Sequence, residues 1–359
     1  MENNSIVAGL VETAEDIEAN ARAEEIKEYQ LAINFLKSIE IFAADEYDKP
    51  KFTLYKNGIG FAPLGNIMAI CAEMKMGKSW LMQQMAVALL KGEFMGLSTE
   101  LEKPSILYFD TEQDKYDSQM VMRRVQYLCG WDFKTDNPQF HIYSMRNFDK
   151  YNEELSIPQN RIIAISKAIE IYRPHVVFVD GVRDLIDDFN DLSESARLVQ
   201  ELMSITSKYN CCIWSVLHVN PNSDKMRGHL GTELGNKVTD VFSVHKNKDQ
   251  TTGEVSFEVK QVAARHRDVD AWLFKINDSG KFAVPELVDA TFARKQELRI
   301  IFNKAFKDQG NRAMTWSDMY DKVHDVEKKR RQTILGWLTD GVKLGMINES
   351  CGKYIYISE

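Results

Sequence analysis

The chain has 359 residues, of which 44% are hydrophobic and 27% charged, and this composition is typical of globular domains with buried cores. No apolar run reaches the roughly 18 residues that a membrane-spanning helix needs, and no basic region followed by an apolar core opens the chain. We therefore expect a cytoplasmic protein without a membrane partner. Five cysteines, an odd number, argue against a framework of disulfides.

The formal net charge of −8 is unevenly distributed along the chain. Residues 1–50 hold 12 acidic residues against four basic ones, which accounts for the whole imbalance. Residues 290–345 hold 12 basic against seven acidic residues, so the C-terminal end can present a basic surface. The acidic total therefore does not exclude a nucleic acid as a partner.

The N-terminal segment, residues 1–43, is predicted to be an acidic helical arm. Its first 25 residues are acidic and Ala/Glu-rich, which is compatible with a helix or with partial disorder. Apolar residues then follow at steps of three and four, which predicts one apolar helical face: Ile26, Tyr29, Ile33, Leu36 and Ile39. This face can pack on the protein's own core or on a neighbouring subunit. Residues 44–64 are interpreted as a connector.

A phosphate-binding loop of the Walker A kind follows a short apolar strand predicted at residues 67–71. The loop consists of Ala72, Glu73, Met74, Lys75, Met76, Gly77, Lys78 and Ser79. In such a loop, backbone N–H groups and the start of the next helix bind phosphates, the Lys reaches the terminal phosphates, and the Ser binds Mg²⁺. Ala72 replaces the usual first glycine, so the loop lacks that glycine's freedom at positive φ. An ordinary helix start is the alternative interpretation.

An amphipathic helix is predicted at residues 81–90, from apolar residues at helical spacing. Strand, loop and helix thus occur in the order that a phosphate-binding loop requires. We expect ATP to contact the loop from Glu73 through Lys78 and Ser79 to Trp80, and Mg²⁺ to bind at Ser79.

The next predicted strand, residues 105–109, ends in an acidic cluster at residues 110–114. Carboxylates at the carboxyl end of a strand in an α/β sheet lie on the edge where ligands bind. There Glu112 could activate a water for attack on the γ-phosphate. The alternative is that the acids only cap the helix predicted at residues 116–128, and for Asp110 and Asp114 we prefer that interpretation.

Two later strand ends carry further candidate residues. The apolar residues 175–179 run into Asp180, a Walker B signature in which the carboxylate holds Mg²⁺ opposite Ser79, although a capping Asp is the alternative. The strand predicted at 211–217 ends in His218, which could sense the γ-phosphate or could be structural. A polar loop follows at residues 220–236. The loop and the adjacent position 237 carry four basic residues: Lys225, Arg227, His229 and Lys237. These residues could bind a nucleic-acid backbone, or the loop could be only a flexible connection.

Two further strands, at residues 238–245 and 255–263, precede a pair of arginines. Arg265 and Arg267 could reach a phosphate in the same subunit or across an interface. A surface ion-pair role is the alternative.

Past Pro285 the pattern changes to three helices and a hairpin. The helices are predicted at residues 292–307, 316–323 and 327–344, with Thr315 capping the second and the basic run 328–331 opening the third. Hairpin strands follow within residues 346–357. This is the order of a winged helix, whose third helix commonly enters the major groove of DNA, while docking to a protein is the alternative.

The ordered set of phosphate loop, Glu112, Asp180 and His218 resembles the RecA-like ATPases. Within these, the chain is most similar to the RepA-type and DnaB-type hexameric helicases of superfamily four and their phage relatives, over roughly residues 55–275. The resemblance implies a magnesium-dependent ATPase whose site is completed by basic residues of the adjacent subunit. Those residues would be Arg265 and Arg267, with Lys237 a weaker candidate.

The sequence therefore predicts an α/β protein with a RecA-like P-loop NTPase core at residues 44–287 and a winged-helix domain at 288–359. The leading hypothesis is a homo-oligomeric, DNA-dependent ATPase, with a hexamer favoured, that acts as a replicative helicase of a plasmid, phage or mobile element. Single-stranded DNA would bind the core loops and duplex DNA the winged helix. The alternatives are an ATPase that loads or remodels a recombination or transposition complex without unwinding, and an ATP-switched DNA-binding regulatory module.

Overall fold

The computed structural model describes residues 14–147, 149–219, 226–248, 253–288, 290–309, 312–350 and 352–357. The chain divides into two compact units, Met1–Lys49 and Pro50–Glu359. Within the described residues, none of the helices combines the length and the apolarity that a membrane crossing requires.

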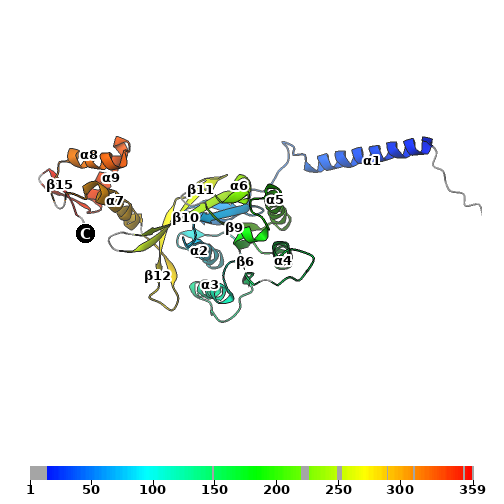
Figure 1. Ribbon diagram of the computed structural model, residues 1–359, viewed down its shortest axis with the longest axis horizontal. Coiled ribbons are helices and arrows are strands. Elements are labelled where there is room, and N and C mark those ends of the chain that lie inside the picture. The colour runs from blue at the N-terminus through cyan, green and yellow to red at the C-terminus, as the bar shows by residue number, and fades with distance from the viewer. Residues whose placement is uncertain are drawn as a thin grey trace, which may run out of the picture. The chain divides into compact units, whose positions relative to one another are not determined.

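The described part of the first unit, residues 14–49, contains the helix α1 (Ala14–Ile39) (Figure 1). Large apolar side chains along this helix are exposed: Ile26, Tyr29, Leu31, Phe35, Leu36 and Ile39. Ile33 is half-buried. The predicted apolar face is therefore present on a helix that leaves most of this face uncovered.

A nine-stranded sheet organises the second unit, in the order β13-β12-β11-β10-β3-β9-β8-β6-β7. From β10 to β7 in this order neighbouring strands are parallel, and β11, β12 and β13 continue the sheet as antiparallel strands. The strands are β3 (Ile67–Ala72), β6 (Ile106–Asp110), β7 (Phe140–Ser144), β8 (Val176–Asp180), β9 (Cys212–His218), β10 (Asp240–Lys248), β11 (Val255–Ala264), β12 (Trp272–Asn277) and β13 (Val284–Leu287). Such a mostly parallel sheet fits a P-loop NTPase core.

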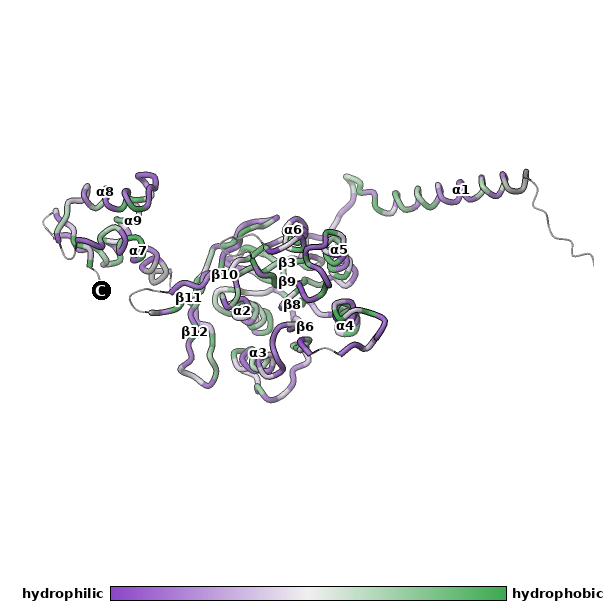
Figure 2. Tube along the Cα trace, viewed as in Figure 1, coloured by the Kyte–Doolittle hydropathy of each residue, from purple (hydrophilic) through white to green (hydrophobic). Residues whose placement is uncertain are grey.

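Helices cover both faces of this sheet, because the strands are apolar on both sides. In β3, Met68 and Ile70 belong to the core shared with α2 (Lys78–Lys91) and α3 (Lys115–Leu128). Ala69 and Cys71 belong to a second core, whose helices are α4 (Ile157–Tyr172), α5 (Leu192–Tyr209) and α6 (Gly228–Lys237). Figure 2 shows the hydrophobic residues gathered along these inner elements. Helix α2, predicted to be amphipathic, is instead buried from Leu81 to Leu89.

The prediction of a connector at residues 44–64 is wrong over its second half. Strands β1 (Phe52–Lys56) and β2 (Ile59–Pro63) form an antiparallel hairpin, which β5 (Leu97–Ser98) and β4 (Glu93–Phe94) extend to a small sheet. The turn is Asn57-Gly58, with φ of 50° and 76°, and this dipeptide favours a two-residue hairpin turn. The sequence therefore contained the signal for a hairpin turn, although the Lys, Gly and Pro residues around it favoured the interpretation as a connector.

The glycine-rich segment interpreted as a loop at residues 220–236 is helical in its second half. Residues 220–225 lie outside the described part, and α6 begins at Gly228. A Cβ on Gly231 would lie 2.5 Å from the backbone carbonyl carbon of Met226, so this glycine serves close packing rather than flexibility.

The C-terminal residues form their own apolar cluster, built from α7 (Ala290–Phe306), α8 (Trp316–Glu327), α9 (Arg331–Lys343) and the hairpin β14 (Ile347–Ser350) and β15 (Lys353–Tyr356). Thr315 caps α8, as predicted, and its hydroxyl accepts the N–H of Asp318. The basic run 328–331 was expected inside the third helix. Instead, Lys328 ends α8 with a φ of 51°, and α9 starts at Arg331, so most of the run is the turn between the two helices.

Candidate nucleotide-binding site

The phosphate loop connects β3 to α2, and its backbone explains why the first glycine is dispensable. Ala72 is the last residue of β3, whereas positive φ values occur at Lys75 (61°) and Gly77 (97°). A Cβ on Gly77 would lie 2.7 Å from Cδ1 of Phe257, a β11 residue. The loop therefore needs glycine at Gly77 but not at Ala72.

The ends of β6, β8 and β9 bring the predicted chemistry to this loop. The register pairs Ala72 with His218 and Asp110 with Asp180 across neighbouring strands. Glu112, Asp180 and His218 consequently line one cavity of about 490 Å³ together with the loop residues Met74, Lys75, Met76, Gly77, Lys78, Ser79 and Trp80. Among the predicted loop contacts, Glu73 does not line the cavity, and its backbone carbonyl instead accepts a hydrogen bond from Lys78 Nζ at 3.0 Å.

Asp180 lies where a Walker B carboxylate is expected. Its Oδ2 accepts hydrogen bonds from Ser79 Oγ at 3.1 Å and from the buried Tyr108 hydroxyl at 2.8 Å. Burial raises the pKa of Asp180 to about 6, while the hydrogen bond from Tyr108 acts in the opposite direction. The hydroxyl and the carboxylate are hard oxygen donors that suit Mg²⁺, which prefers few protein ligands beside substrate phosphates. The described residues hold no cluster of three His, Cys, Asp or Glu that could bind a metal.

A chain of contacts links Lys78, His218 and Glu112. Lys78 Nζ lies 3.1 Å from Nδ1 of His218, and Nε2 of His218 lies 3.4 Å from Oε1 of Glu112. Because an ammonium group only donates, Nδ1 must accept, and Nε2 then carries the proton that faces Glu112. The hydrogen bond from His218 lowers the pKa of Glu112, and the charge of Lys78 adds to this effect. Burial lowers the pKa of Lys78.

The segment that carries Glu112 is tied to the start of α3 and to the end of β8. Asp114 caps α3 as predicted, and Asp110 accepts the backbone N–H groups of Glu112 and Gln113, so both acids serve the local structure. Thr111 Oγ1 donates to the carbonyl oxygen of Asp180 at 2.9 Å. The position of Glu112 is therefore set from both sides.

The structure does not bring Arg265 and Arg267 to this cavity. They follow β11, which runs antiparallel to β10, so they lie at the opposite end of that strand from Phe257. Arg265 Nη2 donates to the carbonyl oxygen of Lys237 at 3.1 Å and thereby caps the end of α6. Arg267 is exposed. Neither arginine lines the phosphate-loop cavity of its own chain.

Several lining residues were not predicted from the sequence: Gln83, Gln113, Val121, Arg124 and Phe257. For one of these residues, Arg124, the sequence contained an indication of a functional role. Arg124 comes three residues after the buried Val121, so it lies on the same face of α3 as a core residue. A charged side chain on a buried face is unfavourable unless an opposite charge or a hydrogen-bonding group pairs with it.

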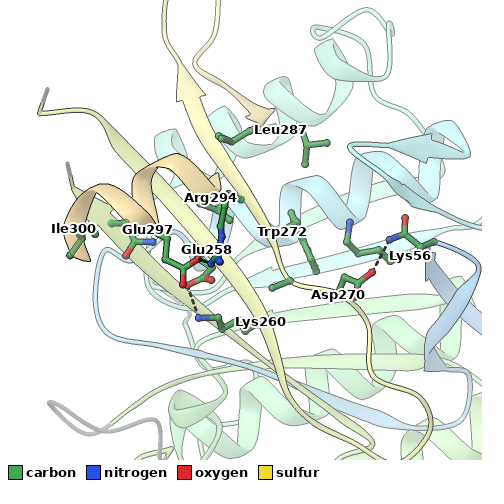
Figure 3. Close-up of a pocket in the computed structure, with 14 residues that line it drawn as sticks. Lys56, Glu258, Lys260, Asp270, Trp272, Leu287, Arg294, Glu297 and Ile300 are labelled. Carbon is green, nitrogen blue, oxygen red and sulfur yellow. Dashed lines mark hydrogen bonds and ion pairs between the residues drawn. The ribbon is translucent and has the colours of Figure 1, made fainter. Parts of the chain in front are cut away.

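A second cavity, of about 840 Å³, contains none of the phosphate-loop residues (Figure 3). Its lining mixes charges of both signs, with Lys260 bound to Glu258 at 2.8 Å and Asn57 bound to Asp270 at 3.1 Å. Its lining residues come mostly from strands and from within α7, not from a loop at the start of a helix, so this cavity lacks the features of a phosphate site.

The fold and the site together define a P-loop NTPase: a mostly parallel sheet whose central strand delivers a phosphate loop to the start of a buried helix. A family model for the AAA domain matches residues 39–224, which is over half of the chain. The chain therefore belongs to the AAA domain family, whose P-loop character implies ATPase activity with nucleotide and usually Mg²⁺ bound. Comparison with curated proteins gave no match.

Proposed function

We propose that this protein is an oligomeric, DNA-coupled ATPase that acts as a replicative helicase of a plasmid, phage or other mobile element. The observation that carries the proposal is the position of His218. Its side chain contacts Lys78 and lies beside Glu112, and its backbone carbonyl accepts the N–H of Arg227 at 3.0 Å. Val219 and Met226 pair across the base of the same polar loop. An event at the phosphates can thus reach this loop through one residue.

The chemistry assigned to the site uses the chain's own side chains. Glu112 is kept ionised by its lowered pKa and can orient and deprotonate the attacking water. Lys78 is expected to leave His218 for the β- and γ-phosphates, which frees Nδ1 of His218 to sense the γ-phosphate. Bound Mg²⁺ would neutralise charge on the phosphates, held by Ser79 and Asp180.

Two surfaces support coupling to DNA. Beside the loop, the guanidinium groups of Arg183 and Arg227 lie over the ring of Phe189, at 5.1 and 5.5 Å. Cations with an aromatic ring are suited to the backbone and bases of a single strand. In the C-terminal cluster, which we propose is a winged helix, α9 exposes one face for duplex DNA: Gln332, Gly336, Thr339 and Lys343.

Oligomer formation is supported by the first unit and by the arginine pair. The uncovered apolar side chains of α1 are suited to contact another copy of the chain. Arg267 is exposed and far along β11 from the cavity of its own subunit, so a phosphate contact would have to be made in trans.

The proposal is tested by measuring ATP hydrolysis with and without single-stranded DNA, together with unwinding of a forked duplex. Stimulation by DNA with strand separation supports the helicase. Stimulation without separation would instead favour an ATPase that remodels a recombination or transposition complex. Tight nucleotide binding with negligible turnover would favour an ATP-switched regulatory module.

Glu112→Gln supplies the matched control for these assays. The amide keeps the size of the side chain but cannot take a proton, so kcat should fall by about 10²–10⁴-fold. Binding of ATP, followed by titration calorimetry, should persist. Near-normal turnover in this variant would remove Glu112 from the mechanism.

A further inference from the structure

One charged side chain in the nucleotide cavity has no role in the chemistry described above. Arg124, on α3, lines the cavity, and its guanidinium lies 4.7 Å above the ring of Trp80. Trp80 directly follows Ser79 at the start of α2. The aromatic ring therefore holds the cation beside the phosphate loop.

The guanidinium of Arg124 is short of partners. Among the described residues it makes no hydrogen bond or ion pair, and its Nε is buried without any acceptor. Asp117 acts on Arg124 only through its charge, without a hydrogen bond or an ion pair between them among the described residues. Since an arginine cannot shed its charge in a protein, Arg124 presents an unpaired cation to the cavity, where a ligand can bind it.

A second unpaired group points to the same ligand. Gln83, one turn into α2, is buried and lines the cavity. Its Nε2 donates to the carbonyl oxygen of Ser79 at 3.1 Å, whereas its Oε1 has no partner. Gln83 therefore has a free acceptor and Arg124 a free donor. A ligand that carries both a donor and an acceptor could bind to the two residues at once.

The order of residues along the loop indicates which part of the nucleotide these groups meet. Glu112 and His218 surround Lys78, so the terminal phosphate and the attacked bond belong there. Trp80 lies two residues farther along the helix start, towards the phosphate nearest the nucleoside. We propose that Arg124, held on Trp80, binds the nucleoside end of ATP, beyond the α-phosphate, with Gln83 accepting from a hydroxyl or amino group there. This rests on the proposed ATPase function.

The test compares ATP with inorganic tripolyphosphate, which has the phosphates but no nucleoside. Binding to the full-length protein is measured by calorimetry for Arg124→Ala, Arg124→Lys and the control Arg123→Ala, which alters a neighbouring α3 residue outside the cavity lining. Arg124→Ala should weaken ATP and ADP by about 10- to 100-fold, the usual effect of losing a charged hydrogen bond, and leave tripolyphosphate unchanged. Arg124→Lys should recover part of the loss, and Arg123→Ala should bind all three ligands normally.

Two results would overturn the inference. Equal loss of ATP and tripolyphosphate would place Arg124 at the terminal phosphates, and unchanged ATP binding with a lowered melting temperature would make its contact with Trp80 purely structural. Lys78→Ala separates this question from the proposed function, since it should weaken both ligands. If the wild-type protein bound neither ligand, the ATPase assignment itself would fail.

Discussion

Asp180 shows how a buried carboxylate can favour function at the expense of stability. Its pKa is raised from 3.8 to about 6, because burial disfavours the charged form. The folded state therefore binds this proton more tightly than the unfolded chain does. Stability from this group is present below about pH 4 and is lost as the pH rises through 6. Without a bound metal, the folded protein is therefore less stable with Asp180 ionised, the form that would bind Mg²⁺, than with Asp180 neutral.

We expect Asp180→Asn to stabilise the free protein at pH 8 while abolishing turnover. With 1.36 kcal/mol per pKa unit, the gain is at most about 3 kcal/mol, and most of it should disappear near pH 4, where Asp180 is neutral in the folded protein and partly protonated in the unfolded chain. Urea denaturation in EDTA at both pH values measures the difference. A variant that gains equally at pH 4, or gains nothing at pH 8, would show that the charge of Asp180 is not what costs stability.

Single residues were predictable where one residue type follows a strand in a fixed pattern. Lys78, Ser79, Glu112, Asp180 and His218 were all named from the sequence, and the structure brings them to one cavity. Other residues were hidden, because their roles depend on which elements become neighbours. Tyr108 is an ordinary strand residue in the sequence, and only the pairing of β6 with β8 places its hydroxyl on Asp180.

At the scale of elements, the junction of β8 with the segment after β6 sets the position of Glu112. Gly181 has a φ of 100°, and a Cβ there would collide with Thr111 Oγ1 and lie 3.2 Å from Cγ of Glu112. Glycine is therefore required both by the backbone and by the space beside Glu112. The two strand ends can approach only because this position lacks a side chain.

Gly181→Ala should displace Glu112 and reduce kcat on the order of 10²-fold, the effect that a shift of about 1 Å can have on a catalytic group. Affinity for ATP should stay close to normal, because the phosphate loop is on another strand. Steady-state kinetics with calorimetric binding separate the two effects. Gly130→Ala, at a positive φ with open space around it, controls for backbone strain alone. Equal losses in the two variants would contradict a positional role.

Helices and strands could be predicted where the hydrophobic pattern was clear. The predictions failed where a glycine serves a turn or close packing. The core strands β3, β6, β8 and β9 read as apolar runs because both of their faces are covered. The hairpin β1–β2 and helix α6 were missed, since their glycines indicate loops when tertiary contacts are unknown. Strands β12 and β13 extend the antiparallel part of the sheet beyond β11, and nothing local specifies that extension.

At the scale of the whole molecule, the proposed oligomer predicts that the site is divided between subunits. Glu112 lies in the cavity of its own chain, whereas Arg267 would serve the cavity of a neighbour. Arg267→Ala should therefore abolish turnover and spare ATP binding. Alone, however, that result would not distinguish a trans contact from a structural defect.

Mixing two inactive variants makes the distinction. When Glu112→Gln and Arg267→Ala subunits are combined in equal amounts and allowed to exchange, about a quarter of the interfaces in a closed ring pair an intact Glu112 with an intact Arg267. ATPase activity should then return to roughly that fraction of wild type, because both groups at such an interface are native. No recovery, with subunit exchange verified by mass measurement, would remove Arg267 from the neighbouring site. The exposed Lys246 and Lys248, near the opposite end of the β10–β11 hairpin, would then be the basic residues to replace in the same experiment.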